Sequence, residues 1–171
     1  MTYQPNSKNL PEKILSISIA FIAIILFGAS GIVPKFNGIY QVTAFVFAIL
    51  SIQIYLKYVF SKYVYKATDE SLQVYKITGK KSICVASLDY SMSISRVISS
   101  ENYMAKKNSL PKTNFNVNYC KNMFPKSYSV YFFEFNGKKS MMKFEPDAEF
   151  SAYVNSLISQ AIDDEDDIYE I

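Results

Sequence analysis

Two long uncharged stretches near the N-terminus constrain this chain more than any other feature of its sequence. Residues 14–33 (ILSISIAFIAIILFGASGIV) contain no charged side chain, and neither do residues 39–56, which run on through Tyr58, Val59 and Phe60. A helix of about 20 apolar residues spans the roughly 30 Å of hydrocarbon in a bilayer. Both stretches are therefore predicted to be transmembrane helices, with spans at about 14–33 and 39–60.

The connection between the two stretches predicts their relative direction. Residues 34–38 can join only antiparallel neighbours, so both ends of the hairpin lie on one side of the membrane. Lys35 lies in the turn, whereas the flanks of the spans carry Lys8, Lys13, Lys57, Lys62 and Lys66. By the positive-inside rule, we expect a multi-pass integral protein of the cell membrane, with the N-terminus and the C-terminal domain in the cytoplasm.

A cleaved signal peptide is the competing interpretation of the first stretch. Lys8 and Lys13 precede it, and Gly28-Ala29-Ser30 offers small residues at a plausible cleavage site. A second full-length span follows at once, which favours the two-helix hairpin. In the alternative, residues 39–60 would still anchor the chain, and the side on which the domain lies would be open.

Inside the hairpin, small residues recur four positions apart, at Ser16 and Ala20 and at Ala44 and Ala48. This spacing lets helix backbones approach closely in lipid. We interpret it as packing within the hairpin, with a partner-facing interface as the alternative. Gln53 is strongly polar and lies well inside the second span, so it is expected to hydrogen-bond to the first helix or to extend to the interface.

Beyond Ser61 the hydrophobic pattern changes to short alternating runs, which are typical of strands with one buried face. Three runs between residues 63 and 88 are separated by turns at Thr68-Asp69-Glu70 and Thr78-Gly79-Lys80. They predict a three-stranded meander. Residues 89–100 fit either a helical turn or a fourth strand.

The rest of the domain is predicted as a loop, three strands, a helix and a tail. Residues 102–113 are expected to form a mobile basic loop and residues 115–119 a strand. Asn136-Gly137 joins residues 127–135 and 138–144 into a hairpin. An apolar stripe with helical spacing predicts a helix of about sixteen residues, whose stripe residues are Phe150, Tyr153, Val154, Leu157, Ile158 and Ala161. The acidic residues 163–171 are predicted to be a disordered tail.

This order of elements resembles that of a known group of proteins. The resembling segments are YKATDESL at residues 65–72, the turn at Gly79, and FEPDAEF at residues 144–150. Over residues 63–161 the chain resembles bacterial two-helix membrane proteins with a pleckstrin-homology-like (PH-like) C-terminal domain. The resemblance implies a membrane hairpin in residues 1–62, followed in residues 63–162 by an antiparallel barrel or sandwich of six to seven strands capped by a C-terminal helix. PH-like folds serve as binding and assembly scaffolds with differing ligands.

Several chemistries have no residues to support them. The chain has no His, which removes Ser-His-Asp and Cys-His catalysis and the commonest metal ligand. Cys84 and Cys120 do not have metal-ligand or CxxC spacing and are interpreted as reduced core thiols. Glu134 has no partner acid, nucleophile or metal at a suitable spacing. We therefore expect no enzymatic activity, catalytic residue, cofactor or metal.

Basic and aromatic side chains in the domain each have two interpretations. Lysines near the spans, turns and long loop are candidate contacts to lipid headgroups, or they solvate turns and protect strand edges: Lys57, Lys62, Lys66, Lys80, Lys81, Lys106, Lys107 and Lys112. Lys138 and Lys139 follow a turn glycine in the same way. The aromatic residues at 128, 131, 132, 133 and 135 are expected to be core, with positions 131, 133 and 135 on one face, although a ligand-lining surface is the alternative.

These features together predict a membrane-anchored, non-enzymatic interaction or scaffold module. Its expected partners are the lipid bilayer and either a protein partner or a second copy of the chain, at the cytoplasmic membrane face. Nucleic acid is not an expected partner, because the positive charge is scattered. The alternatives are a domain that recognises anionic lipid, or an accessory subunit of a transporter or of a peptide-processing complex.

Overall fold

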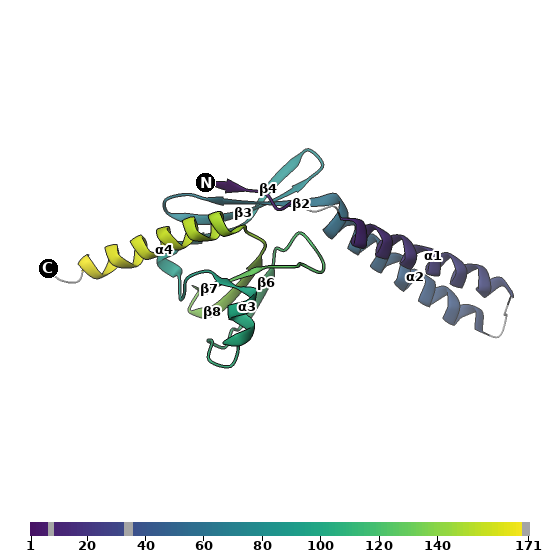
Figure 1. Cartoon of the computed structure of the whole chain (residues 1–171). Coiled ribbons are helices and arrows are strands. Elements are labelled where there is room, and N and C mark those ends of the chain that lie inside the picture. The colour runs from purple at the N-terminus through teal and green to yellow at the C-terminus, as the bar shows by residue number, and fades with distance from the viewer. Residues whose placement is uncertain (7–8, 33–35, 169–171) are drawn as a thin grey trace. The chain divides into compact units, whose positions relative to one another are not determined.

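The computed structural model of the chain describes residues 1–6, 9–32 and 36–168 and divides it into two compact units (Figure 1). One unit is Ser7–Lys62. The other combines Met1–Asn6 with Tyr63–Ile171. The first six residues thus belong with the C-terminal domain, a grouping that the sequence pattern did not suggest.

The first unit is a helical hairpin. Helix α1 covers Leu10–Ile32, and α2 covers Asn37–Ile54 and continues as the π-helix η2, Tyr55–Phe60. Both helices, Leu10–Ile32 and Asn37–Phe60, are long and apolar enough to cross a membrane, with mean hydropathies of 2.4 and 1.8. In the most apolar 18-residue segment of each helix, only 17% and 11% of the residues are buried. Most of the apolar side chains therefore face outward, unlike those of a core helix. Lys8, Pro34 and Lys35 lie outside the described residues.

The second unit contains two sheets of four strands. The first sheet has the order β1-β2-β3-β4, formed by Thr2–Tyr3, Ser61–Ala67, Ser71–Thr78 and Lys81–Asp89. The predicted meander is confirmed as β2 to β4. Strand β1 is an addition: it pairs antiparallel with β2, and the N-terminal amino group donates to the Ala67 carbonyl at 2.8 Å. A bulge lies opposite Val74 and Tyr75, which pair with Ala86 and Cys84 and leave Val85 as the extra residue.

The second sheet has the order β5-β7-β8-β6, formed by Ile98–Ser99, Ser129–Phe135, Lys138–Phe144 and Phe115–Asn118. The predicted hairpin is confirmed, since β7 and β8 pair antiparallel around Asn136 (φ 51°) and Gly137 (φ 71°). Two consecutive positive φ values are those of a type I′ turn, which Asn-Gly favours. Strand β6 also forms, but it pairs parallel with β8, so the expectation of a wholly antiparallel domain was wrong.

Residues 89–113 contain both structures that the sequence left open. A 3₁₀ turn, η3, covers Tyr90–Met92, and the short strand β5 follows. Helix α3, Ser100–Ala105, then occupies the start of the segment predicted as a basic loop, and the Ser99 hydroxyl caps it by accepting from the Asn102 amide. The segment is therefore partly helical.

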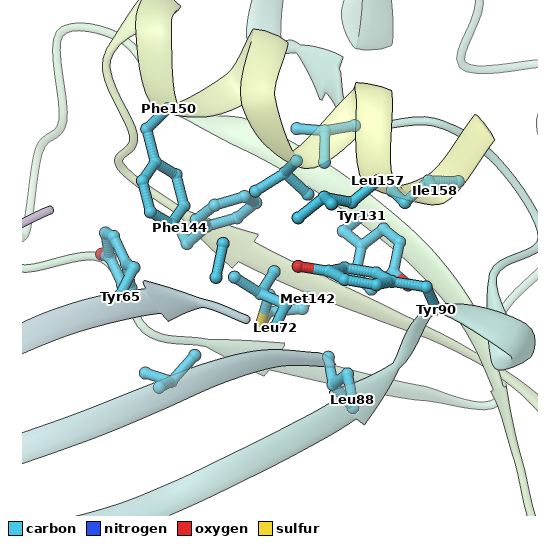
Figure 2. Close-up of a cluster of buried hydrophobic side chains, with 14 of the residues drawn as sticks. Tyr65, Leu72, Leu88, Tyr90, Tyr131, Met142, Phe144, Phe150, Leu157 and Ile158 are labelled. Atoms are coloured by element: carbon cyan, nitrogen blue, oxygen red, sulfur yellow. The ribbon is translucent and has the colours of Figure 1, made fainter. Parts of the chain in front are cut away.

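One C-terminal helix, α4, covers Ala148–Ile168 and packs its apolar stripe on the main core (Figure 2). Its buried residues meet side chains from both sheets: Phe150, Val154, Leu157 and Ile158 of α4 lie against Tyr65, Leu72, Tyr131, Met142 and Phe144. The helix continues through residues 163–168, where a disordered tail was predicted, and is longer than the sixteen residues expected. Residues 169–171 lie outside the described part of the chain.

Strand β7 is buried on both faces. Tyr131 and Phe133 belong to the main core, whereas Val130 and Phe132 join Met141 in a second cluster on the other side of the sheet. Phe135 is 54% exposed, so its predicted place in the core was wrong: it lies at the end of the strand, beyond the packed elements. The two sheets and the helix form a mainly-β domain that is not a closed barrel.

Candidate functional site

A pair of serines joins the two helices of the hairpin. The Ser16 hydroxyl donates to the Ser51 carbonyl at 3.1 Å, and the Ser51 hydroxyl donates to the Ser16 carbonyl at 2.8 Å. Both side chains are buried, whereas Gln53, the residue that we expected to make such a bond, is exposed. A hydroxyl shared between helices in lipid contributes roughly 0.6 kcal/mol on average and up to about 1.7 kcal/mol.

The sequence signal that would have identified Ser51 is the recurrence of small residues every seven positions. Small residues are buried at Ser16, Ala23 and Ser30 of α1 and at Ala44 and Ser51 of α2. A seven-residue repeat keeps one seam facing the partner in left-handed helix packing. The spacing of four noted in the sequence combines this seam with its neighbouring row: Ser16 and Ala44 are buried, and Ala20 and Ala48 are only half-buried.

That neighbouring row and part of the seam line an apolar groove between α1 and α2. The groove has a volume of about 390 Å³ and is lined by Ala20, Ala23, Ile24, Phe27, Ala44, Phe45, Ala48, Ser51 and Ile52. The Phe27 and Phe45 rings meet edge to face at 6.4 Å. Alanines in the middle of the groove fill little space between the helices. The lining has no titratable side chain, and the hydroxyl of Ser51 is already engaged with Ser16.

Such a groove fits a long apolar occupant whose width is the same along its length. Helices in lipid associate through van der Waals packing at small residues, which permit close approach of a backbone. A hydrocarbon chain or an apolar helix satisfies these requirements, and a charged or strongly polar ligand does not.

The candidate lysines fall into separate groups. Lys57 lies on η2 with its ammonium 5.0 Å from the centre of the Tyr58 ring. Lys62 and Lys66 are exposed on β2, and Lys80 and Lys81 are exposed at the β3–β4 turn. The hydrogen bond from the Thr68 amide to the Ser71 carbonyl closes the β2–β3 turn. Because β2 runs toward this turn and β3 runs away from it, the end of β3 lies at the same end of the sheet as the start of β2. The β3–β4 turn therefore also lies at that end.

The other three lysines lie elsewhere in the domain. Lys106, Lys107 and Lys112 are exposed on the connection from α3 to β6. The Asn114 amide donates to the Lys139 carbonyl at 2.8 Å, which places this connection beside the start of β8. In Figure 1 the α3 connection and the β3–β4 turn lie on opposite sides of the domain. The structure therefore does not gather the eight lysines into one basic surface.

A buried carboxylate holds the connection between β6 and β7. Glu145 is 6% exposed and accepts hydrogen bonds from the backbone amides of Lys121 (2.9 Å) and Asn122 (3.2 Å) and from the Asn122 side-chain amide (3.1 Å). The Tyr65 hydroxyl donates to the Tyr119 carbonyl at 2.9 Å and accepts from the Glu145 amide at 3.2 Å. Burial raises the pKa of Tyr65, which keeps this phenol neutral and able to donate.

The long-range contacts of Glu145 could not be foreseen from its position in the sequence. Residues 120–126, within the connection that it holds, were not assigned to any element either. Within this connection Phe124 is 71% exposed. Among the large hydrophobic side chains described in the domain, Phe124 has the highest exposed fraction, and an anchored loop presents it to solvent.

Acid–base and metal chemistry has little support among the described residues. The described part of the chain contains no group of three or more Cys, Asp or Glu side chains placed to hold a metal ion. Glu134 is exposed on β7 opposite Lys139. Cys84 and Cys120 are both reduced thiols; Cys120 is buried as expected, but Cys84 is exposed on β4, so its assignment as a core thiol was wrong.

No family model, no curated protein and no solved structure matches the chain. The chain consists of two helices able to span a membrane, followed by a mainly-β domain of two sheets with a C-terminal helix. Its function therefore has to be inferred from the residues of these two units.

Proposed function

We propose that this chain is a membrane-anchored, non-enzymatic interaction module whose hairpin docks an apolar transmembrane helix in the groove between α1 and α2. The observation that carries the proposal is the groove of about 390 Å³ with its row of alanines. The occupant is a transmembrane helix of a protein partner or of a second copy of the chain. An accessory subunit of a transporter or of a peptide-processing complex is one form of this function, distinguished by the identity of the partner.

In this proposal the β domain serves as a PH-like scaffold. Its two sheets and C-terminal helix enclose a continuous apolar core, which makes it a stable unit for presenting loops. The lysines that follow the second helix favour the cytoplasmic side for this domain, because positive charge is retained there.

Filling the groove tests the proposal. Ala48→Leu and Ala20→Leu add side-chain volume inside the groove, whereas Ser18→Leu adds it at an exposed position of α1 outside the groove. The full-length protein is purified gently from membranes, and its mass and co-purifying proteins are determined. We expect a stoichiometric companion protein or a second copy with the native chain and with Ser18→Leu, and its loss with both groove variants. A strictly monomeric native particle without a companion would overturn the proposal.

Recognition of anionic lipid is a second candidate function, favoured by one specific observation. Lys80 and Lys81 are exposed at the end of the sheet where β2 begins, and β2 follows directly on the second candidate span. Covalent continuity limits how far this end of the domain can be from a bilayer. Lys106, Lys107 and Lys112 do not share that end, so we propose no lipid-binding role for them.

A further inference from the structure

The exposed Phe124 lies on a loop whose backbone is restrained on both sides of this residue. The two backbone amides on its N-terminal side, at residues 121 and 122, donate to the buried Glu145 carboxylate, and Pro125 restricts the backbone on the other side. Lys126 follows and is exposed. An aromatic residue at the tip of a restrained loop, next to a lysine, is suited to an interface that is apolar on one side and polar on the other.

The start of this loop lies beside Tyr63, which follows closely on the end of the second candidate span. The Tyr119 ring packs against the Tyr63 ring with centroids 5.9 Å apart, and the Tyr119 hydroxyl donates to the Val85 carbonyl at 3.2 Å. Tyr63 comes three residues after Phe60, the last residue of that span. Because an extended chain advances at most about 3.6 Å per residue, Tyr63 is within roughly 11 Å of the end of the span.

The same end of the domain also carries exposed basic and apolar side chains. Lys80 lies in the β3–β4 turn, Lys81 begins β4, and Ile83, two residues further along β4, is 60% exposed. Exposed lysines and Ile83 at this end, and the exposed Phe124 on the loop that starts beside Tyr63 and Val85, are the side-chain types that complement a leaflet with anionic headgroups above an apolar layer. Phe135, at the Asn136-Gly137 turn of the second sheet, is similarly exposed but does not lie at this end.

We propose that the 119–126 loop inserts the Phe124 ring into the headgroup boundary of an anionic bilayer, while Lys80, Lys81 and Lys126 contact the lipid phosphates. The partner is the surface of the leaflet from which the second span emerges. This inference rests on the membrane anchoring in the proposed function, but it does not depend on what fills the groove between the helices. The insertion ties the β domain to the membrane surface at a second point besides the covalent one.

Tryptophan fluorescence can test this insertion with little interference, because the chain has no native Trp. Three single variants of the full-length chain are reconstituted into nanodiscs of phosphatidylcholine with phosphatidylglycerol: Phe124→Trp, Phe135→Trp and Phe21→Trp. Phe21 is 63% exposed on α1 and reports the anchoring itself. Emission is compared between ordinary lipids and lipids brominated in their acyl chains, which quench nearby indole rings.

We expect Phe124→Trp to lose more than half of its emission in brominated lipid and to shift to shorter wavelength, while Phe135→Trp keeps its emission. Equal emission of Phe124→Trp in both lipids, with Phe21→Trp strongly quenched, would overturn the insertion and leave the anchoring intact. An unquenched Phe21→Trp would overturn the anchoring in the proposed function as well.

The lysines are tested in the same background. Replacing Lys80, Lys81 and Lys126 by Gln in Phe124→Trp should weaken the quenching at low salt, and nanodiscs of phosphatidylcholine alone should weaken it in the unsubstituted lysine background. Quenching of equal strength in both tests would show that the lysines do not contact lipid phosphates, and would overturn that part of the proposal.

Discussion

The hydroxyls of Ser16 and Ser51 each donate to the backbone carbonyl of the other residue, so a reciprocal pair of hydrogen bonds joins α1 to α2. The two hydroxyl oxygens are themselves 3.2 Å apart. In a hydrocarbon environment water cannot replace these bonds. The pair therefore fixes the register of one helix against the other.

Replacing both serines tests this register. Ser16→Ala and Ser51→Ala each remove one bond and leave the other in place, so each should lower the free energy of unfolding by roughly 0.6 to 1.7 kcal/mol, and the double variant by about the sum of the two losses. The free energy of unfolding of the full chain is measured in mixed detergent micelles. Ser30→Ala is the matched control, because the Ser30 hydroxyl bonds within its own helix, to the Phe27 carbonyl at 2.6 Å. A loss for either alanine no larger than that of Ser30→Ala would contradict the reciprocal pair.

The hydrogen bonds to the Glu145 carboxylate should stabilise the loop that carries Phe124. Glu145→Gln replaces an acceptor oxygen by an amide donor and leaves buried backbone amides unsatisfied, at a cost of about 1 to 3 kcal/mol. Hydrogen exchange measured by mass spectrometry should speed up in residues 119–126. Glu134→Gln is the control, since Glu134 is exposed on β7. Unchanged exchange in the loop would mean that Glu145 does not hold it.

Local patterns in the sequence were sufficient to predict the strands of the first meander and the β7–β8 hairpin. Alternation identifies a strand with one buried face, and Asn136-Gly137 favours the positive φ values of a tight turn. The pattern of β6 was equally clear, but alternation carries no information on strand direction. Its parallel pairing with β8 depends on the path of the connecting segment, which no local rule predicts.

The site was harder to predict because its contacts are long-range. Polarity alone pointed to Gln53 as the hydrogen-bonding residue, yet the rotational position of Ser51 on α2 decides which residue meets α1. Glu145 holds amides 23 and 24 residues away, and a contact of this kind leaves no periodic trace. Phe124 was not identified either, because a single aromatic residue in a loop has no pattern around it.

The β7–β8 turn gives a third prediction. Gly137 has φ 71°, and a methyl group added at its α-carbon would meet no atom within 4 Å, so Gly137→Ala is opposed by the backbone conformation and not by crowding. We expect a loss of about 1 kcal/mol in the free energy of unfolding. Gly28→Ala, which is also uncrowded but lies within α1, should cause no such loss. Equal effects of the two variants would contradict the turn geometry.

High pH should destabilise the β domain through its buried tyrosines. Burial raises the pKa of Tyr131 to about 12, from an ordinary value of 10.0, although its hydrogen bond with Ser93 lowers it in part. Burial also raises the pKa of Tyr65 and Tyr90. A raised pKa means that the folded state favours the neutral phenol, so the stabilisation is complete below pH 10 and is lost as the pH rises toward 12.

Each such tyrosine steepens the fall in stability by about 1.4 kcal/mol per pH unit within that window. Urea unfolding of the full chain at a series of alkaline pH values should show a shallower fall for Tyr131→Phe, which has no phenol to ionise at that position. Ser93→Ala removes the same hydrogen bond but keeps the phenol, so it should lower stability at neutral pH and retain the steep alkaline fall. A Tyr131→Phe profile parallel to that of the native chain would show that ionisation of this phenol does not limit the alkaline stability of the domain.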